Sequence, residues 1–307
     1  MENSTRKTLF PNVWDVLAMP LIFFAVHIVF GLALNLSGLQ QPSVSTAPQE
    51  SIDNMQYMIE QVELGNYNAI VYSLLMTLAL VALVVYVRCR GGRGAIKIRH
   101  AGRGFNPNVI LGGLIWLLSA QFVLDPLSIW FPASDGSNIG RGLGALLSVM
   151  VAAPILEEIL FRGVVYEALR KRWSILISIL FSSLFFGVVH GSVSSAVVAA
   201  VAGVIFCLLY ERTNSIFATI IVHSINNLLA FSMICYGFDN VSFYEIVGGG
   251  STYYIAYAVA FVVFVLLSVE AYFALFRRKD KRVDKAEVEN ETTAIVEKID
   301  TDELSEK

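Results

Sequence analysis

Residues 142–160, GLGALLSVMVAAPILEEIL, form the stretch of sequence that decides the fold. The run is apolar over nearly the length of helix, about 20 residues, that crosses the hydrocarbon core of a bilayer. The whole chain shares this character, because 56% of its residues are hydrophobic and only 15% are charged. A soluble domain carries about 25% charged residues, so lipid is the expected solvent. The sequence predicts an all-α fold, a polytopic transmembrane helical bundle.

Other apolar runs of similar length bring the expected number of membrane spans to about eight. The helix that begins near residue 142 is expected to continue to Arg170. The first run of the chain is too long for a signal-peptide core, which favours a retained anchor. Apart from the run at 142–160, the apolar runs cover residues 13–36, 69–87, 109–131, 174–189, 193–210, 216–235 and 253–276.

Basic residues indicate how these spans are oriented. If the spans alternate in direction, Lys and Arg gather on one side, notably in segments 88–103, 170–172 and 277–282. The positive-inside rule makes that side cytoplasmic, so the N- and C-termini are both expected to be cytoplasmic. The chain is thus expected to be an integral, multi-pass membrane protein in contact with membrane lipid. Nucleic-acid binding has no support in this charge pattern.

The distribution of the apolar runs also predicts a regional organisation. Residues 1–142 form an N-terminal transmembrane region with an extracytoplasmic loop near 37–68. Residues 143–235 form a core that carries the polar residues discussed next, and residues 236–276 form a loop and the last span. Residues 277–307 are charged and poor in large apolar residues, which is typical of a disordered cytoplasmic tail.

Two adjacent carboxylates, Glu157 and Glu158, lie inside the quoted run. An ionisable side chain in the middle of a span costs about 2.5–3.5 kcal/mol on insertion scales, so this pair calls for an explanation. Arg162 follows Glu158 by one helical turn, in the favourable order for an i,i+4 ion pair. Such a pair would leave Glu157 free to face a cavity. The alternative is that both glutamates only neutralise Arg162 near a membrane boundary.

Further polar residues lie in two other runs. His190 follows Phe186 by one turn, at a helix end where a histidine is usually an interfacial group, although imidazole also suits acid–base chemistry. His223 and Asn227 are four residues apart, which places them on one helix face about 6 Å apart. The alternative for these two is a structural hydrogen bond between helices, which Asn226 could make equally well.

The chain has four histidines, and the other two, His27 and His100, have no comparable polar neighbours in the sequence. We therefore interpret His27 and His100 as structural. Each polar element has an ordinary explanation when it is taken alone. Together, however, they lie on three separate spans: a pair of carboxylates, a histidine, and a His/Asn pair on one helix face. This combination favours a common site.

The ordered patterns Glu-Glu-x-x-x-Arg, Phe-x-x-x-His and His-x-x-x-Asn resemble the type II CAAX prenyl endopeptidase and bacteriocin-processing (CPBP, Abi) family of intramembrane proteases. The likeness covers residues 143–231 and includes the whole of 157–163. It implies a protease core at 143–235 and an intramembrane endopeptidase that hydrolyses a peptide bond with glutamate-activated water. The substrate implied is a peptide or protein that enters from the bilayer or the cytoplasm.

The resemblance also implies a role for each motif residue. Glu157 would polarise the attacking water, which His190 would hold from a neighbouring helix. His223 and Asn227 would stabilise the oxyanion of the tetrahedral intermediate. In a site that excludes water, hydrogen-bond donors stabilise such a developing charge most strongly. The expected supporting residues are Glu158, Arg162 and Phe186.

A metal is the open question of this mechanism. Glu157, His190 and His223 form a His-His-Glu set of the type that zinc accepts, with a position left for water. The zincin motif His-Glu-x-x-His is absent, however, and Asn227 fits an oxyanion role without a metal. The metal-free glutamate mechanism is preferred, and zinc, in a metalloendopeptidase, is kept as the alternative cofactor.

The depth of these residues in the membrane is a test of the whole hypothesis. Counting helical rise from the inner boundary places Glu157 and His190 roughly 20–25 Å deep but His223 only about 12 Å deep. Helix tilt, or a connection at 213–216 that is buried in protein, could bring them together.

Two functions from other classes remain as alternatives. A non-catalytic scaffold or bacteriocin-immunity protein of the same family predicts filled packing with every polar group paired. A proton-coupled transporter predicts a substrate path between pseudo-symmetric halves. The protease predicts site residues that converge around a wet cavity.

Overall fold

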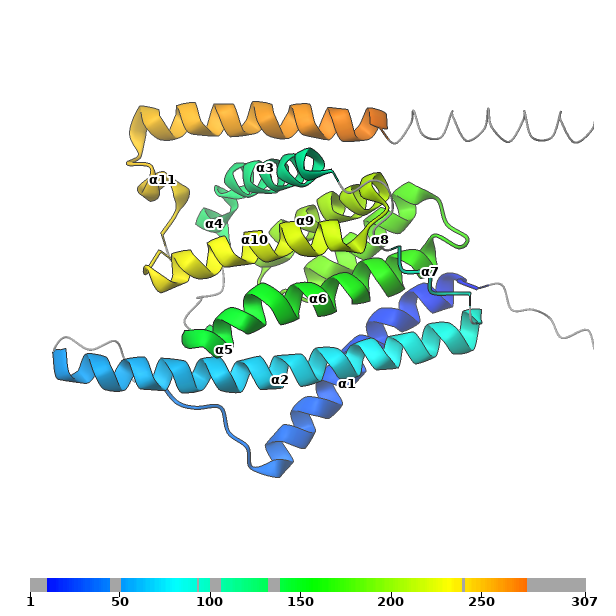
Figure 1. The fold of residues 1–307 in the computed structure, drawn as a ribbon, viewed down its shortest axis with the longest axis horizontal. Coiled ribbons are helices and arrows are strands. Elements are labelled where there is room, and N and C mark those ends of the chain that lie inside the picture. Colours follow the sequence, from blue (N-terminus) through cyan, green and yellow to red (C-terminus); the bar gives the residue numbers. More distant parts are fainter. Residues whose placement is uncertain are drawn as a thin grey trace, which may run out of the picture.

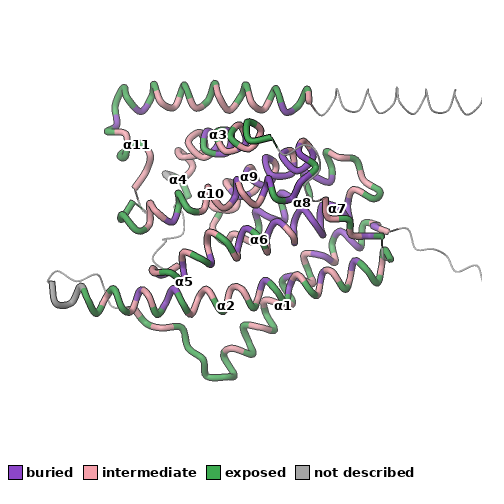
Figure 2. The backbone as a smooth tube through the Cα atoms, viewed as in Figure 1, coloured by how far each residue is buried: buried purple, intermediate pink, exposed green. Residues whose placement is uncertain are grey.

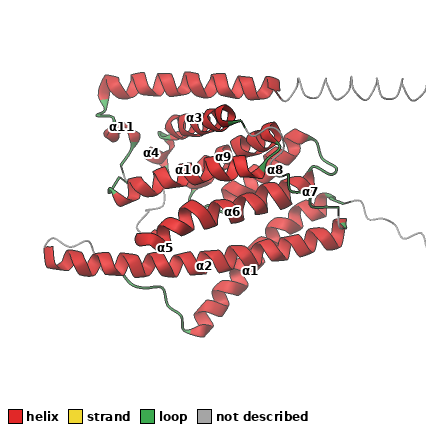
Figure 3. Ribbon diagram, in the orientation of Figure 1, coloured by secondary structure: helices red, strands yellow, loops and turns green. Residues whose placement is uncertain are grey.

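The described part of the protein is built from helices. The computed structural model describes residues 10–44, 51–92, 94–99, 106–131, 139–238 and 241–274, and these ranges contain no strand (Figures 1 and 3). The predicted all-α fold is therefore confirmed. In chain order the elements are α1 (Val13–Ser37), α2 (Ser51–Gly91), α3 (Pro107–Leu124), α4 (Leu127–Trp130), α5 (Gly142–Leu147), η2 (Ser148–Ala152), α6 (Ala153–Glu158), η3 (Ile159–Tyr166), α7 (Glu167–Leu169), α8 (Ile175–Val188), α9 (Val193–Thr213), α10 (Ile216–Cys235) and α11 (Phe243–Ile246), followed by the last helix, Gly250–Ala274.

Seven helices in the described ranges are long and apolar enough to cross a membrane. The eighth expected span, 174–189, forms the shorter helix α8, whose 14 residues rise only about 21 Å. Ser174 caps the start of α8 by accepting a hydrogen bond from the Ile177 backbone N–H, and a turn at Gly191, with φ of 84°, follows its end. The prediction of about eight spans thus becomes seven full-length helices and one short apolar helix.

Helix α2 is longer than the sequence suggested. It begins at Ser51 rather than near Ala69, so much of the segment 37–68 that was expected to be a loop is helical. Figure 1 shows the start of α2 projecting beyond the central helices, with α1 crossing α2 at an angle. The expected tail, 277–307, lies outside the described residues. The cytoplasmic orientation of the termini stays a prediction.

The helix Gly142–Leu169 was predicted to continue past residue 160, and it does, but not as a regular α-helix. Two π-helical segments, η2 and η3, flank the short α-helix α6 that carries both glutamates. Such wider turns are rare and occur mostly at functional sites. Side chains from other helices bond to carbonyls of these segments, since Asn227 Nδ2 donates to Val149 O (3.0 Å) and Ser182 Oγ donates to Phe161 O (3.1 Å).

Helices α8 and α9 pack closely because small residues face each other. A Cβ atom on Gly187 would lie 2.5 Å from the Ala196 carbonyl oxygen, and one on Gly203 would lie 3.0 Å from Ser183 Cα. Close backbone approach through small residues is typical of helix packing in membranes. Figure 2 shows buried residues concentrated in these central helices, whereas α1 and the last helix are mostly exposed or half-buried, as expected for lipid-facing elements.

A buried polar cluster holds segment 94–99 against the central helices. Arg99 pairs with Glu167 (Nε to Oε1, 2.6 Å) and with Glu211 (Nη2 to Oε1, 2.8 Å). The Tyr166 hydroxyl donates to Glu211, and the Tyr210 hydroxyl accepts from the Arg99 backbone N–H. Burial opposes the charge of the guanidinium, but the hydrogen bond and charge of Glu211 raise the pKa of Arg99 above its usual value. This cluster ties segment 94–99 to η3, α7 and α9.

Candidate active site

Glu158 and Arg162 form the predicted ion pair. Arg162 Nη1 lies 2.9 Å from Glu158 Oε1, and both side chains are 0% exposed. Arg162 also donates from Nη2 to Gly203 O (3.3 Å), and its guanidinium carbon lies over the rings of Phe186 (4.5 Å) and Phe206 (4.9 Å). A charge buried this deeply is stable only with such partners. The pair therefore fixes η3 against α8 and α9.

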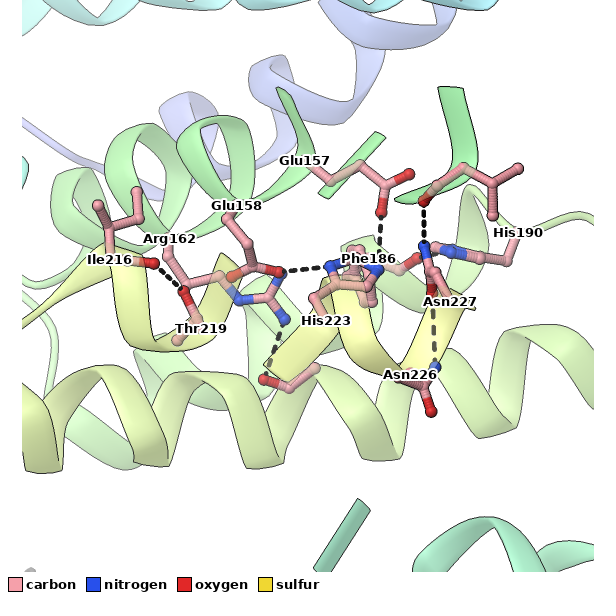
Figure 4. A network of polar contacts seen from close by, with 12 residues as sticks. Glu157, Glu158, Arg162, Phe186, His190, Ile216, Thr219, His223, Asn226 and Asn227 are labelled. Atoms are coloured by element: carbon pink, nitrogen blue, oxygen red, sulfur yellow. Dashed lines mark hydrogen bonds and ion pairs between the residues drawn. The ribbon is translucent and has the colours of Figure 1, made fainter. Parts of the chain in front are cut away.

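His223 lies between the two glutamates (Figure 4). Its Nδ1 is 3.0 Å from Glu158 Oε1, and its Nε2 is 3.7 Å from Glu157 Oε2. Because the Glu158 carboxylate also accepts from Arg162, Nδ1 of His223 is the donor in this contact. The ring stacks on Phe206 with a centroid distance of 4.9 Å. This arrangement leaves Nε2 of His223 turned toward Glu157.

The contact between His223 and both glutamates removes the apparent mismatch in depth. In the connection between α9 and α10, Thr213 is 2%, Ser215 0% and Ile216 4% exposed, whereas Asn214 is exposed. The backbone N–H of Ile216 donates to Arg99 O (2.9 Å), so the start of α10 packs against segment 94–99. Of the two arrangements considered from the sequence, the structure contains a connection that is buried except at Asn214.

Glu157 occupies the inner end of a cavity. The residue is 9% exposed, and the Tyr72 hydroxyl of α2 donates a hydrogen bond to Oε1. Among the described residues, Oε2 has no hydrogen-bond partner. The cavity has a volume of about 400 Å³, and we call it the Glu157 cavity. Its lining includes Gly65, Asn68, Ala69, Tyr72 and Leu75 of α2, Ile139, Ala145, Ser148, Val149, Ala153 and Glu157, and Asn227 of α10.

Asn227 lines the same cavity and is held at both ends of its amide. Nδ2 donates to Val149 O (3.0 Å), and Oδ1 accepts from Asn226 Nδ2 (3.4 Å). Asn226 in turn accepts from Gln121 Nε2 (2.7 Å), so it points toward α3. An amide nitrogen carries two hydrogens, and Asn227 uses one of them on Val149. The second can therefore serve a group in the cavity.

His190 packs against Phe186 rather than against Glu157. Its Nδ1 lies 2.6 Å from Phe186 O, and its ring meets the Phe186 ring edge-on at 4.6 Å. Phe186 also contacts the His223 ring at 6.0 Å, so both histidines pack on one phenylalanine. Figure 4 draws His190 at the Asn227 end of the network, but within the described residues it makes no hydrogen bond to Glu157 or His223.

The expected metal ligands do not converge. Within the ranges that the structure describes, no three His, Cys, Asp or Glu side chains gather closely enough to hold a metal ion. Glu157 and His223 are neighbours, whereas His190 makes no contact with either of them in the described structure and bonds through Nδ1 to the Phe186 carbonyl. Because the three side chains do not gather, the set Glu157, His190 and His223 does not fit zinc as arranged.

Tyr72 is the site residue that sequence reasoning missed. It lies in the apolar run 69–87, far in sequence from the three motifs. The available signal was weak, because a tyrosine hydroxyl inside a span needs a partner but does not reveal which one. His27, by contrast, makes the expected structural contact, with Nδ1 2.9 Å from Phe23 O. His100 lies outside the described residues.

Comparison with known proteins supports the motif assignment. Residues 140–229 match the family model described as Rce1-like, type II CAAX prenyl endopeptidase Rce1-like. The resemblance seen in the sequence is confirmed over this segment, which contains every motif residue but excludes Tyr72. Neither the curated proteins nor the solved structures gave a match. With seven apolar helices and this protease-family segment, the chain is an integral, multi-pass membrane protein.

Proposed function

We propose that the protein is an intramembrane endopeptidase that hydrolyses a peptide bond with water activated by Glu157. The observation that carries the proposal is the state of the Glu157 carboxylate. One oxygen is held by Tyr72, while the other is buried with no hydrogen-bond partner in the described structure, and Glu157 lines a cavity. The family match at 140–229 supports a protease-like activity for the same segment.

The water would bind between Glu157 and His223. Glu157 Oε2 and His223 Nε2 are 3.7 Å apart, too far for a direct hydrogen bond but close enough for one water to donate to both. Such a water would keep a lone pair turned toward the cavity. This gives His223 the water-holding role that the resemblance assigned to His190, and His190 then acts only through Phe186.

Hydrolysis would follow by general base catalysis. Glu157 takes a proton from the water as its oxygen attacks the carbonyl carbon of the substrate. The second hydrogen of Asn227 Nδ2 donates to the oxyanion that forms. Collapse of the intermediate breaks the C–N bond, and Glu157 returns the proton to the leaving amine. The products are a new carboxylate and a new amine, and Glu157 is again ionised.

A scaffold or immunity protein is less well supported by this geometry. That alternative predicts filled packing and a partner for every polar group. Glu158 and Arg162 are fully buried and form an ion pair, although Glu158 Oε2 and Arg162 Nε also have no hydrogen-bond partner among the described residues, and neither side chain lines the cavity. Glu157 does not fit filled packing, since its Oε2 has no such partner and the residue lines a cavity of about 400 Å³. We therefore assign a stabilising role to the pair of Glu158 and Arg162, and a catalytic role to Glu157.

The test compares cleaved protein termini in cells that produce the wild-type protein or Glu157→Gln. We expect a set of new termini that appears with the wild-type protein and disappears with Glu157→Gln at equal protein levels in the membrane. The matched control is Glu63→Gln, which makes the same change at an exposed position of α2 and should preserve cleavage. An identical set of termini with Glu157→Gln would refute the proposal.

A further inference from the structure

The carbonyl group of Val149 depends on a side chain for its hydrogen bond. In an α-helix it would accept from the Ala153 backbone N–H, but in the π-helical segment η2 that N–H donates to Ser148 O. In a π-helix it would accept from the next residue, Pro154, which has no N–H. Neither helical donor is therefore available to Val149 O in this part of the described chain. Asn227 Nδ2 of α10 donates to it instead, at 3.0 Å.

This bond fixes which way the Asn227 amide is turned. A backbone carbonyl only accepts hydrogen bonds, so the atom of Asn227 that faces Val149 O must be Nδ2, and Oδ1 must face away from it. Oδ1 accepts from Asn226 Nδ2 at 3.4 Å (Figure 4). The orientation of the Asn227 amide is thus set by the backbone of η2 and not by Asn227 alone.

The same reasoning extends to α3. Because Asn226 presents Nδ2 to Asn227, it presents Oδ1 to Gln121, whose Nε2 donates to it at 2.7 Å. We call Gln121, Asn226 and Asn227 the amide chain. Turning any one of these amides around would bring two oxygens or two NH₂ groups together. The three amides therefore hold one another in a single orientation.

This orientation matters because the nitrogen end of Asn227 lies at the wall of the Glu157 cavity. Val149, Asn227 and Glu157 all line that cavity, and Nδ2 is the end of the amide that is bonded to Val149. In the reversed orientation an oxygen would lie there, and it would repel the oxyanion that forms during hydrolysis. One donor to an oxyanion contributes about 10²–10³-fold to kcat.

We propose that Gln121 and Asn226 are positioning residues, which hold the Asn227 amide with its nitrogen toward the cavity. This inference rests on the proposed function for the role of Asn227, and it extends the site to α3. Gln121 lies outside the segment 140–229 that the family model matches, so the family motifs give no sign of it. Without the donor from Gln121, Asn226 can turn its amide around. Asn227 Oδ1 then loses the partner that keeps it away from the cavity.

A double-mutant cycle on the cleavage rate of the purified protein tests the positioning role. Gln121→Met removes the donor and keeps the length of the side chain, whereas Asn227→Ala removes the oxyanion donor itself. We expect Gln121→Met to lower kcat about 10-fold or more, up to the loss seen in Asn227→Ala, with little change in KM. In the Asn227→Ala background, Gln121→Met should cause no further loss. The matched control is Gln56→Met, at an exposed position of α2, which should preserve kcat.

The second variant, Asn226→Leu, should reproduce the loss of kcat and guards against a folding defect in Gln121→Met. An unchanged kcat in both variants would overturn the inference. Equal losses from Gln121→Met with and without the Asn227 amide would also overturn it, because Gln121 would then act through packing and not through Asn227. Wild-type kcat in Asn227→Ala would contradict the proposed oxyanion role, and the positioning role with it.

The thermal unfolding temperature in detergent tests the amide chain without requiring activity. Gln121 and Asn226 are bonded directly, so the shift in the double variant of Gln121→Met and Asn226→Leu should be smaller than the sum of the two single shifts. Additive shifts would overturn the inference. Coupled shifts in a protein that shows no proteolysis in any assay would uphold the amide chain and contradict the proposed function, so the two failures are distinguishable.

Discussion

Tyr72 changes how the candidate site is understood at the scale of single residues. The motif residues all lie in the segment matched by the family, whereas Tyr72 comes from α2 and donates to Glu157 Oε1. Its hydrogen bond leaves Oε2 without a hydrogen-bond partner in the described structure, so Oε2 is the oxygen that would accept from the water in the proposed mechanism. We therefore assign Tyr72 as a positioning residue for the proposed general base.

Removing the Tyr72 hydroxyl should slow catalysis more than it weakens substrate binding. A hydrogen bond to a charged group contributes about 1.5–3 kcal/mol, so Tyr72→Phe should lower kcat about 10- to 100-fold with little change in KM. The measurement is steady-state cleavage by purified protein. Tyr67→Phe, at a half-buried tyrosine of the same helix, should leave both constants unchanged. An unchanged kcat in Tyr72→Phe would rule out the positioning role.

Arg162 should matter for stability as well as for activity. Arg162→Met would leave the Glu158 carboxylate buried without its ion pair, which costs about 3–5 kcal/mol where both groups are fully buried. We expect a clear fall in the thermal unfolding temperature in detergent. Arg172→Met removes an exposed arginine and should have little effect. Equal unfolding temperatures for the two variants would contradict the structural role of the pair.

At the scale of elements, the π-helical segments explain why the site was only partly predictable. The pair of Glu158 and Arg162 followed from i,i+4 spacing, and the structure contains it. The contact of His223 with both glutamates depends on a buried start of α10 and on the irregular turns around α6, neither of which leaves a periodic signal. The same holds for Tyr72, whose partner is 85 residues away.

The close contact between α2 and the start of the next core helix should be sensitive to one methyl group. Alanine is favoured over glycine by about 1 kcal/mol inside a helix. Gly65→Ala should nevertheless destabilise the protein, because the new Cβ would lie 2.3 Å from Arg141 O. Gly31→Ala has nothing within 4 Å of its Cβ and should be neutral or stabilising. Thermal unfolding of both variants checks this opposite response, and a stabilised Gly65→Ala would show that the contact is not tight.

At the scale of the whole molecule, composition and the lengths of the apolar runs were sufficient for the fold class. Seven of the expected spans are long enough to cross a membrane, and the 174–189 run differs because it forms only a short helix packed on α9. The sequence did not predict the helical start of α2, since residues 51–68 are too polar to be recognised as part of a span. A cavity at Glu157 was expected, but its wall on α2 was not predicted, because that wall depends on how the helices pack together.

The arrangement of site residues predicts activity that does not depend on a metal ion. Treatment of the purified protein with 1,10-phenanthroline, followed by dialysis, should leave the cleavage rate unchanged. The reason is that no group of three His, Cys, Asp or Glu side chains among the described residues is arranged to hold a metal ion. Loss of activity that returns on addition of zinc would show that His190 moves to join Glu157 and His223 around a metal.

The most direct test of the account is the cleavage rate of purified Glu157→Gln in lipid vesicles. The substrate is a peptide that spans a cleavage site mapped in cells with the wild-type protein. A general base contributes about 10²–10⁴-fold to the rate, so Glu157→Gln should lose activity by that factor while Glu63→Gln keeps it. Cleavage by Glu157→Gln at the wild-type rate would contradict the central claim that Glu157 activates the water.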